Sequence, residues 1–450
     1  MKSIKNNLSH LTSHISGFLS HPGVRRYGIN TAWLFTEQVL RLIAGFFVGV
    51  WVARYLGPEK FGLFSYALAF VSIFQGIAKL GLDGIVVRDL VQEPEKRDVY
   101  LGTSFWLKLI GGVITFLIIA IILFIQSIFT SNFFTETNIY ILIIAFGIIF
   151  QSFEVIDFYY QATVQAKYIS IRRIIQLILS SIIKIFLVLT GADLIWFVLV
   201  SLFDIISLSI MGWLIYRSQG LPNFVRYFDI ETGKKLLKDS WPLLLSGIAI
   251  SIYMRIDQVM IKNMLGDREV GLYSAAMRLV EVWYFIPMII TQSVFPAIVS
   301  RYNDKQEFYR RLVILSAVMG YLGLFLSIIL SLSSYFIIKI LYGEKFLDAA
   351  STLSIASFII FITFWMSGVG RRQAIDMQKF ALFATILSAI SNIILNLIFI
   401  PIYGVKGAAI VSVLNQFIAG PFFAFVHPKA RENFYIALRG LILPFKGFKV

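Results

Sequence analysis

The sequence contains no cysteine and only four histidines, His10, His14, His21 and His427, all of them near the ends of the chain. Disulfide bonds, thiolate nucleophiles and cysteine-bound metals are therefore excluded. The sequence also lacks a Ser/His/Asp arrangement, a metal-ligand cluster and a glycine-rich phosphate loop. We therefore expect no catalytic residue, no metal and no cofactor, and a protein that is not an enzyme.

Charge is also scarce, because only 14% of the residues are charged whereas 58% are hydrophobic. Soluble domains usually contain about 45–50% apolar residues. Runs such as residues 111–125, GGVITFLIIAIILFI, recur along the chain and cannot face water. A membrane-spanning helix needs roughly 20 apolar residues. The composition excludes a soluble enzyme, a nucleic-acid-binding protein and a disordered protein.

We predict an all-α polytopic membrane protein with twelve spans in two six-helix halves around a central cavity. The apolar segments lie at 28–52, 61–80, 102–125, 139–160, 174–190, 194–216, 240–261, 272–299, 312–333, 349–370, 380–400 and 407–426. The expected parts are a cytoplasmic N-terminal segment (1–27), a first bundle (28–216), a cytoplasmic linker (217–239), a second bundle (240–426) and a cytoplasmic tail (427–450). Within the eighth span, Pro287 and Pro296 predict a kink or a break.

The N-terminal segment lacks the continuous apolar stretch and the cleavage site of a secretion signal. Its apolar residues Ile4, Leu8, Leu11, Ile15 and Phe18 recur at helical spacing. This spacing predicts a short helix on the membrane surface, with a frayed tail as the alternative.

The placement of the basic residues predicts the orientation. With a cytoplasmic N-terminus, the inner segments hold 27 of the 40 Lys and Arg residues and the outer loops hold 7. This bias indicates a multi-pass protein of the cytoplasmic (inner) membrane with both termini inside. The net charge of +15 then serves topology and contacts with anionic membrane lipids, without a nucleic-acid partner. The remaining six cations lie in or at the ends of spans and are Arg41, Lys79, Lys108, Lys184, Arg255 and Arg278.

An internal repeat supports the division into halves. Residues 56–67, LGPEKFGLFSYA, and 265–276, LGDREVGLYSAA, are identical at six of twelve positions with a constant offset of 209. Each copy joins the first and second helices of a half. Parallel repeats of this kind are a common plan of transporters, with the substrate path at the repeat interface. The alternative is a coincidence between two glycine-rich turns.

The same segments resemble a known family. The motif WVARYLGPEKFGLFSYA (residues 51–67) and the later IPIYGVKGAAIVS (residues 400–412) are similar to those of the polysaccharide transporter family. That family belongs to the multidrug/oligosaccharidyl-lipid/polysaccharide exporter superfamily. The resemblance implies a flippase for undecaprenyl-pyrophosphate-linked oligosaccharides of the O-antigen, capsule or related type. Twelve spans fit this family, whereas lipid II flippases usually have fourteen.

Polar residues on the seventh span predict a cavity wall. Ser240, Gly247, Ser251, Arg255, Gln258 and Lys262 fall on one face of this helix. Packing between helices tolerates serine and glycine but does not by itself require an arginine. The alternative to a cavity-lining role is that the arginine forms a buried structural ion pair. Placing an ionisable group at bilayer depth costs about 2.5–3.5 kcal/mol in the free energy of membrane insertion, so we expect each such group to have a role.

Other spans carry further polar candidates. Glu37 and Arg41 are four residues apart on the first helix, and Arg278 and Glu281 lie on the eighth; each acid–base pair could simply neutralise itself. Lys184 lies on the fifth helix, Asp257 on the seventh, and Asn392 and Asn396 form a neutral stripe on the eleventh. Lys79 ends the second span and is interpreted as a membrane anchor.

Guanidinium groups bind phosphate oxygens through paired hydrogen bonds and stay charged when partly dehydrated. We therefore assign Arg41, Arg255, Arg278 and Lys184 to pyrophosphate binding, and Ser251, Gln258, Asn392 and Asn396 to the cavity lining. Glu37, Asp257 or Glu281 would couple transport to protons or sodium. Expected partners are the lipid-linked oligosaccharide, membrane lipids, and a glycan polymerase with its chain-length machinery. The alternatives are a cation-coupled exporter of drugs or metabolites and a membrane polymerase of glycan assembly.

Overall fold

The structure is a computed structural model, and it describes residues 22–130, 135–376 and 378–442. The surface helix predicted from Ile4 to Phe18 lies outside these residues. Within them all regular elements are helices. Those of at least four residues with α geometry are α2 (Pro22–Lys79), α3 (Asp83–Gln92), α4 (Arg97–Thr130), α5 (Glu136–Phe150), α6 (Val155–Ala162), α7 (Ala166–Leu189), α8 (Leu194–Ser218), α9 (Ile230–Leu265), α10 (Asp267–Glu281), α11 (Phe285–Val299), α12 (Lys305–Leu332), α13 (Ser334–Leu341), α14 (Ala349–Ala356), α15 (Phe358–Asp376), α16 (Gln378–Tyr403), α17 (Val405–Phe417), α18 (Phe423–Val426) and α19 (Arg431–Ile442).

Ten stretches of the described chain are long and apolar enough to cross a membrane. The first of them, Gly28–Gln92, contains a chain reversal at Gly57, and it therefore includes more than one helix. α7, which carries four basic residues, is not among the ten. The chain is thus an all-helical, multi-pass membrane protein, and the count of twelve spans stays a prediction.

The two copies of the sequence repeat share one backbone conformation. Gly57 breaks α2 with φ 73° and ψ 171°, and Gly266 separates α9 from α10 with φ 101° and ψ −178°. Glycine adopts such positive φ values without the steric cost of a Cβ atom. The glycines at these two positions are therefore required by the turn that each repeat makes.

The repeats also pack directly against each other. A Cβ atom added at Gly62 would lie 1.8 Å from the carbonyl oxygen of Asp267, and one added at Gly271 would lie 1.9 Å from that of Pro58. The two contacts are equivalent, because Gly271 and Asp267 occupy the same positions in the second repeat as Gly62 and Pro58 do in the first. The two halves of the sequence therefore meet at this point through backbone-to-backbone contact.

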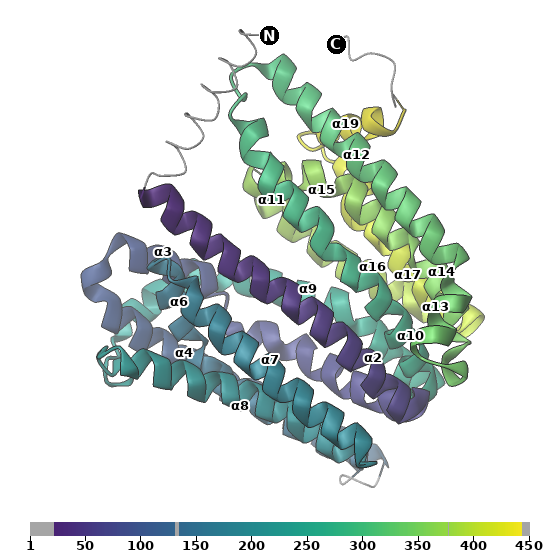
Figure 1. Cartoon of the computed structure of the whole chain (residues 1–450), viewed down its shortest axis with the longest axis horizontal. Helices are drawn as coiled ribbons and strands as arrows, with labels where there is room; N and C mark the ends of the chain where they lie inside the picture. The colour runs from purple at the N-terminus through teal and green to yellow at the C-terminus, as the bar shows by residue number, and fades with distance from the viewer. Residues whose placement is uncertain (1–21, 131–134, 377, 443–450) are drawn as a thin grey trace, which may run out of the picture.

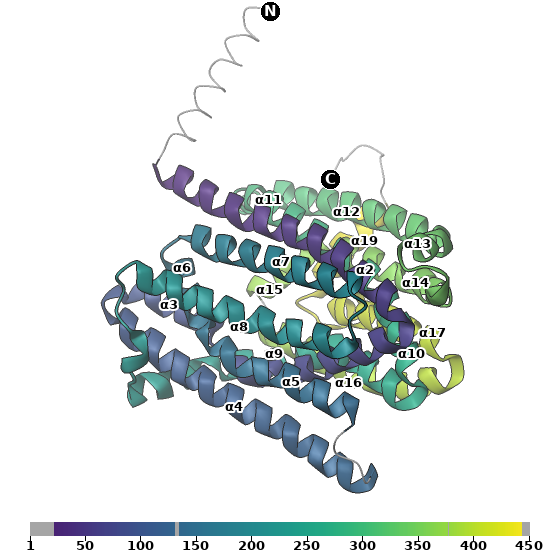
Figure 2. The same cartoon turned by 60° about the horizontal axis from the view of Figure 1, so that its bottom comes forward.

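The helices of the two halves of the chain occupy different sides of the molecule. Figures 1 and 2 show α4, α5 and α8 on one side and α12, α13 and α14 on the other. α2 contacts both α9 and α10, so it joins the two sides. Near the far end of this contact, a Cβ atom at Gly76 would lie 2.6 Å from the backbone nitrogen of Ile248.

The span predicted at 272–299 is broken near its prolines, as expected. α10 ends at Glu281, a short 3-10 turn covers Val282–Tyr284, and Pro287 lies in the first turn of α11. Proline at the start of a helix leaves no additional donor unsatisfied, whereas Pro296 lies inside α11 and removes one hydrogen bond.

Two segments predicted as linker and tail contain helix. α9 begins at Ile230, inside the predicted linker 217–239, because the side chain of Asp229 accepts a hydrogen bond from the backbone of Thr232 and caps the helix. α19 lies inside the predicted tail 427–450 and is fixed by hydrogen bonds from Trp365 to the carbonyl of Ala437 (2.8 Å) and from Tyr321 to that of Leu441 (2.7 Å). The domain boundaries themselves stay predictions.

Candidate functional site

Two cavities follow one another along α2 and α9, between the two halves of the chain. The first, cavity A, has a volume of about 370 Å³ and is bounded by α2, α9 and α10. Its charged lining residues are Arg255, Arg278 and Glu281, which leaves a formal charge of +1. Its polar lining residues are Ser65, Ser72, Gln258 and Ser274. Cavity A therefore combines cations with hydrogen-bonding groups at the junction of the repeats.

Arg255 and Glu281 form an ion pair across cavity A. The guanidinium Nη1 lies 3.3 Å from the carboxylate Oε1, and each side chain is 32% exposed. Glu281 is thus paired with Arg255 on α9 and not with Arg278 on its own helix, the pairing that the sequence left open. Because the contact is single and both groups are partly exposed, the guanidinium keeps donors that face the cavity.

Arg278 is held by backbone and has no carboxylate partner among the described residues. Its Nη2 donates a hydrogen bond to the carbonyl oxygen of Gly45 at 3.2 Å. A Cβ atom at Gly49 would lie only 2.1 Å from this Nη2, so the guanidinium occupies space that glycine leaves free. Gly45 and Gly49 lie on the first part of α2, and the contact therefore links the two halves of the chain.

The second cavity, cavity B, has a volume of about 320 Å³ and lies next along the same two helices. Gln75 and Lys79 from α2 line it, together with Ser251 from α9. Ser251 is one helical turn from Arg255 on α9, and Gln75 is one turn from Ser72 on α2. The predicted lining residues Ser251 and Gln258 are thus divided between the two cavities.

Asp257 points away from these cavities into a buried polar network. Its carboxylate accepts hydrogen bonds from Tyr273 (2.6 Å), Ser412 (3.0 Å) and Asn396 (2.7 Å), and Asn396 also donates to Asn392 (2.6 Å). Asp257 is 6% exposed, Asn392 1% and Asn396 0%. The two asparagines therefore surround Asp257 between α9, α10, α16 and α17 instead of lining a cavity.

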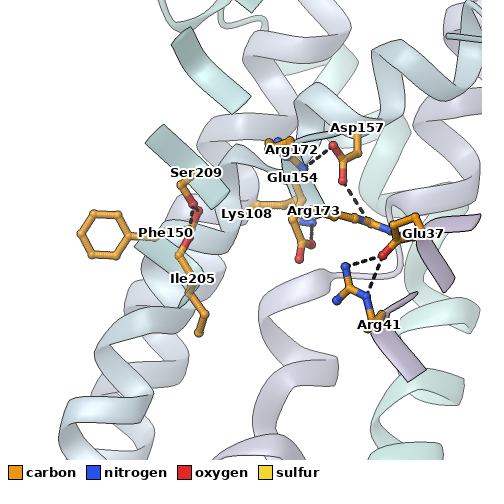
Figure 3. A network of polar contacts seen from close by, with 10 residues as sticks. All are labelled: Glu37, Arg41, Lys108, Phe150, Glu154, Asp157, Arg172, Arg173, Ile205 and Ser209. Carbon is orange, nitrogen blue, oxygen red and sulfur yellow. Dashed lines mark hydrogen bonds and ion pairs between the residues drawn. The ribbon is translucent and has the colours of Figure 1, made fainter. Parts of the chain in front are cut away.

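Glu37 and Arg41 belong to an ion-pair network in the first half of the chain. Figure 3 shows Arg41 against Glu37, with Arg173, Asp157 and Arg172 continuing the series. Arg41 Nη2 lies 2.5 Å from Glu37, and Arg173 reaches both Glu37 (3.8 Å) and Asp157 (3.1 Å). Arg41 therefore pairs with Glu37 and does not line cavity A with Arg255 and Arg278, with which we expected it to share one site.

Lys184 and Lys108 are also paired within the first half. Lys184 Nζ lies 3.0 Å from Asp204, which is bound in turn by Gln176 at 2.8 Å. Lys108 is buried, with its Nζ 2.9 Å from Glu154. Lys184 is thus joined to α8 and is not brought together with the arginines of cavity A.

Several residues of the site were not predicted from the sequence, or were predicted to have only a minor role. Ser65, Ser72, Gln75 and Lys79 form one polar face of α2, at steps of seven, three and four residues, and this stripe was readable from the helical period. Tyr273 lies in the repeat and Ser412 in the late motif, yet neither signals a contact with Asp257. Among the described residues no group of three His, Asp or Glu side chains could hold a metal ion.

Comparison with known proteins identifies the family. Residues 28–301, more than half of the chain, match the family model described as "Polysaccharide biosynthesis protein". The chain belongs to this family. A second family model, MatE, matches residues 242–402. The polysaccharide biosynthesis match covers both copies of the repeat and the three charged residues of cavity A.

Individual relatives agree with this family. The chain is 24% identical over 423 residues to "Probable flippase AglR" of Haloferax volcanii, covering 90% of this chain and 84% of that protein. It is 22% identical to the "Capsular polysaccharide biosynthesis protein CapF" of Staphylococcus aureus, covering 87% and 96% of the two chains. The solved structure "Lipid II flippase MurJ, inward closed conformation" superposes with a TM-score of 0.67 at 20% identity, over 93% of this chain and 91% of that one. The chain therefore shares the fold of that solved structure.

Proposed function

We propose that this protein is a flippase that moves undecaprenyl-pyrophosphate-linked oligosaccharide repeat units, of O-antigen, capsule or a related polysaccharide, across the cytoplasmic membrane by alternating access. The observation that carries the proposal is cavity A, in which two arginines from α9 and α10 face a space between the repeats that is lined by both polar and apolar side chains. The names of the relatives support the substrate class.

Arg255 and Arg278 are the proposed pyrophosphate ligands. Guanidinium groups match phosphate oxygens geometrically and remain charged at partial burial. The polar groups of Gln258 and Ser251 would face the sugars, while the lipid tail stays in the bilayer. Arg41 and Lys184 are left out of this site, because neither lines cavity A.

Among the three acidic residues considered for ion coupling, Asp257 is the best supported. Glu37 is paired with Arg41 and Arg173, and Glu281 with Arg255. Asp257 instead has neutral hydrogen-bonding partners, and a buried carboxylate without a cation is costly. Binding of a proton or a sodium ion at this carboxylate would offset that cost and bias the packing of α9 against α16 and α17.

The proposed orientation places both termini in the cytoplasm, following the distribution of Lys and Arg. In this orientation Lys79 and cavity B lie nearer the cytoplasmic surface than cavity A. The partners we propose are the lipid-linked oligosaccharide and a glycan polymerase with its chain-length machinery. The protein itself performs no covalent chemistry in this scheme.

The proposal is tested by glycan display in a host that lacks its own flippase. Wild-type protein should restore surface glycan, Arg255→Ala should not, and Arg255→Lys should restore it in part because the charge is kept. Equal expression is verified by immunoblotting of membranes. Full restoration by both variants would remove Arg255 from the mechanism.

The second candidate is a cation-coupled exporter on the same fold, favoured by the MatE match over residues 242–402. An exporter of this kind would raise drug resistance in a sensitive host without affecting surface glycan. A polymerase, the third candidate, is separated by chain length, since its loss leaves single repeat units at the surface while loss of a flippase leaves none.

A further inference from the structure

The six cations in or at the predicted spans differ in their partners. Four of them have a carboxylate within ion-pair distance, namely Arg41, Lys108, Lys184 and Arg255. The ammonium group of Lys79 and the guanidinium of Arg278 have none among the described residues. These two cations line cavity B and cavity A, respectively. Both cations without a carboxylate partner therefore face the space between the halves, together with the paired Arg255.

Lys79 lies at the last residue of α2, beside Gln75 and across cavity B from Ser251. Asp83 also lines cavity B and lies 3.6 Å from the buried ammonium of Lys108, which pairs more closely with Glu154 at 2.9 Å. An uncompensated cation at bilayer depth or at its edge needs a partner or water. The two lysines and two carboxylates at this place carry no net charge, but Lys79 has no direct ion pair among the described residues, so its ammonium can turn toward an anion that enters the cavity.

The two cavities place their cations in series along the same helices. Ser72 lines cavity A and Lys79 lines cavity B, seven residues apart on α2. Seven residues of an α-helix rise by about 10 Å. On α9, Ser251 and Arg255 line the same two cavities one turn apart. An anion moving along this wall meets Lys79 first and the two arginines second.

Cavity B carries a lysine where cavity A carries arginines. This difference suits an entry step in cavity B and a holding step in cavity A. Lysine is a compact, strongly hydrated charge on a flexible stem, whereas arginine offers a fixed fork of donors. Beside Lys79, Gly76 and Gly247 line cavity B and leave backbone instead of side chains on its wall. Cavity B is therefore suited to a group that is bound loosely and passed on.

We propose that cavity B is a first pyrophosphate station, in which Lys79, Gln75 and Ser251 receive the substrate before Arg255 and Arg278 take it over in cavity A. This inference rests on the proposed function and adds a site to it. Lys79, interpreted from the sequence as a membrane anchor, becomes a substrate-contacting residue.

The experiment measures binding of undecaprenyl pyrophosphate to the purified full-length protein by native mass spectrometry, with undecaprenol as the reference lipid. If the pyrophosphate occupies either station, removing one cation weakens binding modestly because the other station remains. Lys79→Ala and Arg255→Ala should each weaken binding by about twofold to fivefold, and the double variant by at least about tenfold relative to either single variant. Lys79→Arg, which keeps the charge and adds donors, should bind at least as tightly as wild type.

A second readout separates the two stations during transport in proteoliposomes. Lys79→Ala should raise the substrate concentration needed for half-maximal flipping, with little change in the maximal rate, while Arg255→Ala should lower the maximal rate. Thermal unfolding of Lys79→Ala should match wild type, since the ammonium group has no ion pair to lose among the described residues.

The proposed function and the station in cavity B are contradicted by different results. If wild-type protein binds undecaprenyl pyrophosphate no better than undecaprenol, the proposed function is contradicted. If wild type binds it but Lys79→Ala has no effect, both alone and together with Arg255→Ala, the entry station is overturned while the proposed function stands.

Discussion

The guanidinium of Arg278 on α10 donates a hydrogen bond to the carbonyl oxygen of Gly45 on α2, at 3.2 Å, and so joins the two halves of the chain at the wall of cavity A. A phosphate oxygen in cavity A is a stronger acceptor for this guanidinium than a neutral carbonyl. Substrate binding would therefore compete with a contact between the halves, which offers a physical route from binding to movement.

Gly49→Ala tests this relationship. The added methyl group would collide with the guanidinium, because a Cβ atom at Gly49 lies 2.1 Å from Arg278 Nη2. Arg278 must then move, and we expect flipping to fall by at least about tenfold, as for loss of a charge-assisted hydrogen bond. The measurement is the initial rate in proteoliposomes. Gly45→Ala is the matched control, since a Cβ atom there meets nothing within 4 Å, and it should retain activity.

Gly62→Ala should destabilise the contact between the repeats. A Cβ atom at this position would lie 1.8 Å from the backbone oxygen of Asp267, which cannot rotate away as a side chain would. Overpacking of this kind costs about 1–3 kcal/mol in the free energy of unfolding. A lower thermal unfolding temperature in detergent is expected. Gly84→Ala, which meets nothing within 4 Å, should leave it unchanged; equal unfolding temperatures for both variants would argue against close packing of the repeats.

Two ion pairs of the network in Figure 3, Arg172–Asp157 and Arg41–Glu37, should differ in their contribution to stability. Arg172 and Asp157 pair at 2.5 Å, and each side chain is only 6% exposed. Removing the carboxylate in Asp157→Ala leaves buried charge unpaired and should cost about 3–5 kcal/mol. Arg41 is 41% exposed, and Glu37 keeps Arg173 nearby when Arg41 is removed.

Arg41→Ala should therefore unfold within a few degrees of wild type and retain flipping, because the buried carboxylate of Glu37 keeps Arg173 as a counter-charge at 3.8 Å. Chemical denaturation in detergent and glycan display measure the two properties. A complete loss of glycan display by a stable Arg41→Ala protein would return Arg41 to the substrate site.

Asp257→Asn tests the proposed ion coupling. The amide has nearly the shape of the carboxylate and can still accept from Tyr273 and Ser412, so the fold should be kept. It cannot take up a proton or hold a sodium ion by charge. We expect flipping by this variant to become independent of imposed sodium or pH gradients. Ser412→Ala, which removes one neutral donor, should keep the gradient dependence; unchanged dependence in Asp257→Asn would place the coupling elsewhere.

The fold could be predicted largely from the amino-acid composition and from the spacing of apolar and polar residues along the chain. Apolar segments separated by basic loops locate the helices, and the positive-φ glycines Gly57 and Gly266 could be inferred from the repeat. Segments outside the apolar runs were harder to assign. α19 was read as tail because its stability comes from hydrogen bonds of Trp365 and Tyr321, which are far away in sequence.

The site could be predicted only in part. The spacing of residues along a helix shows which face of the helix each residue lies on, but it does not show which residue of another helix it contacts. The period correctly grouped Arg255 and Gln258, which both line cavity A. It could not show that Glu37, the partner of Arg41, is also met by Arg173, or that Asn396 donates to both Asp257 and Asn392. Such partners depend on how helices from distant parts of the chain cross.

The central claim is tested most directly by translocation of a fluorescent oligosaccharide linked to undecaprenyl pyrophosphate in proteoliposomes that contain only this protein. Accessibility of the glycan to a lectin or quencher outside the vesicles reports crossing. We predict that wild-type protein moves the lipid, that the Arg255→Ala and Arg278→Ala double variant does not, and that Arg41→Ala does. No movement by wild type above protein-free vesicles, or equal movement by the double variant, would contradict the account.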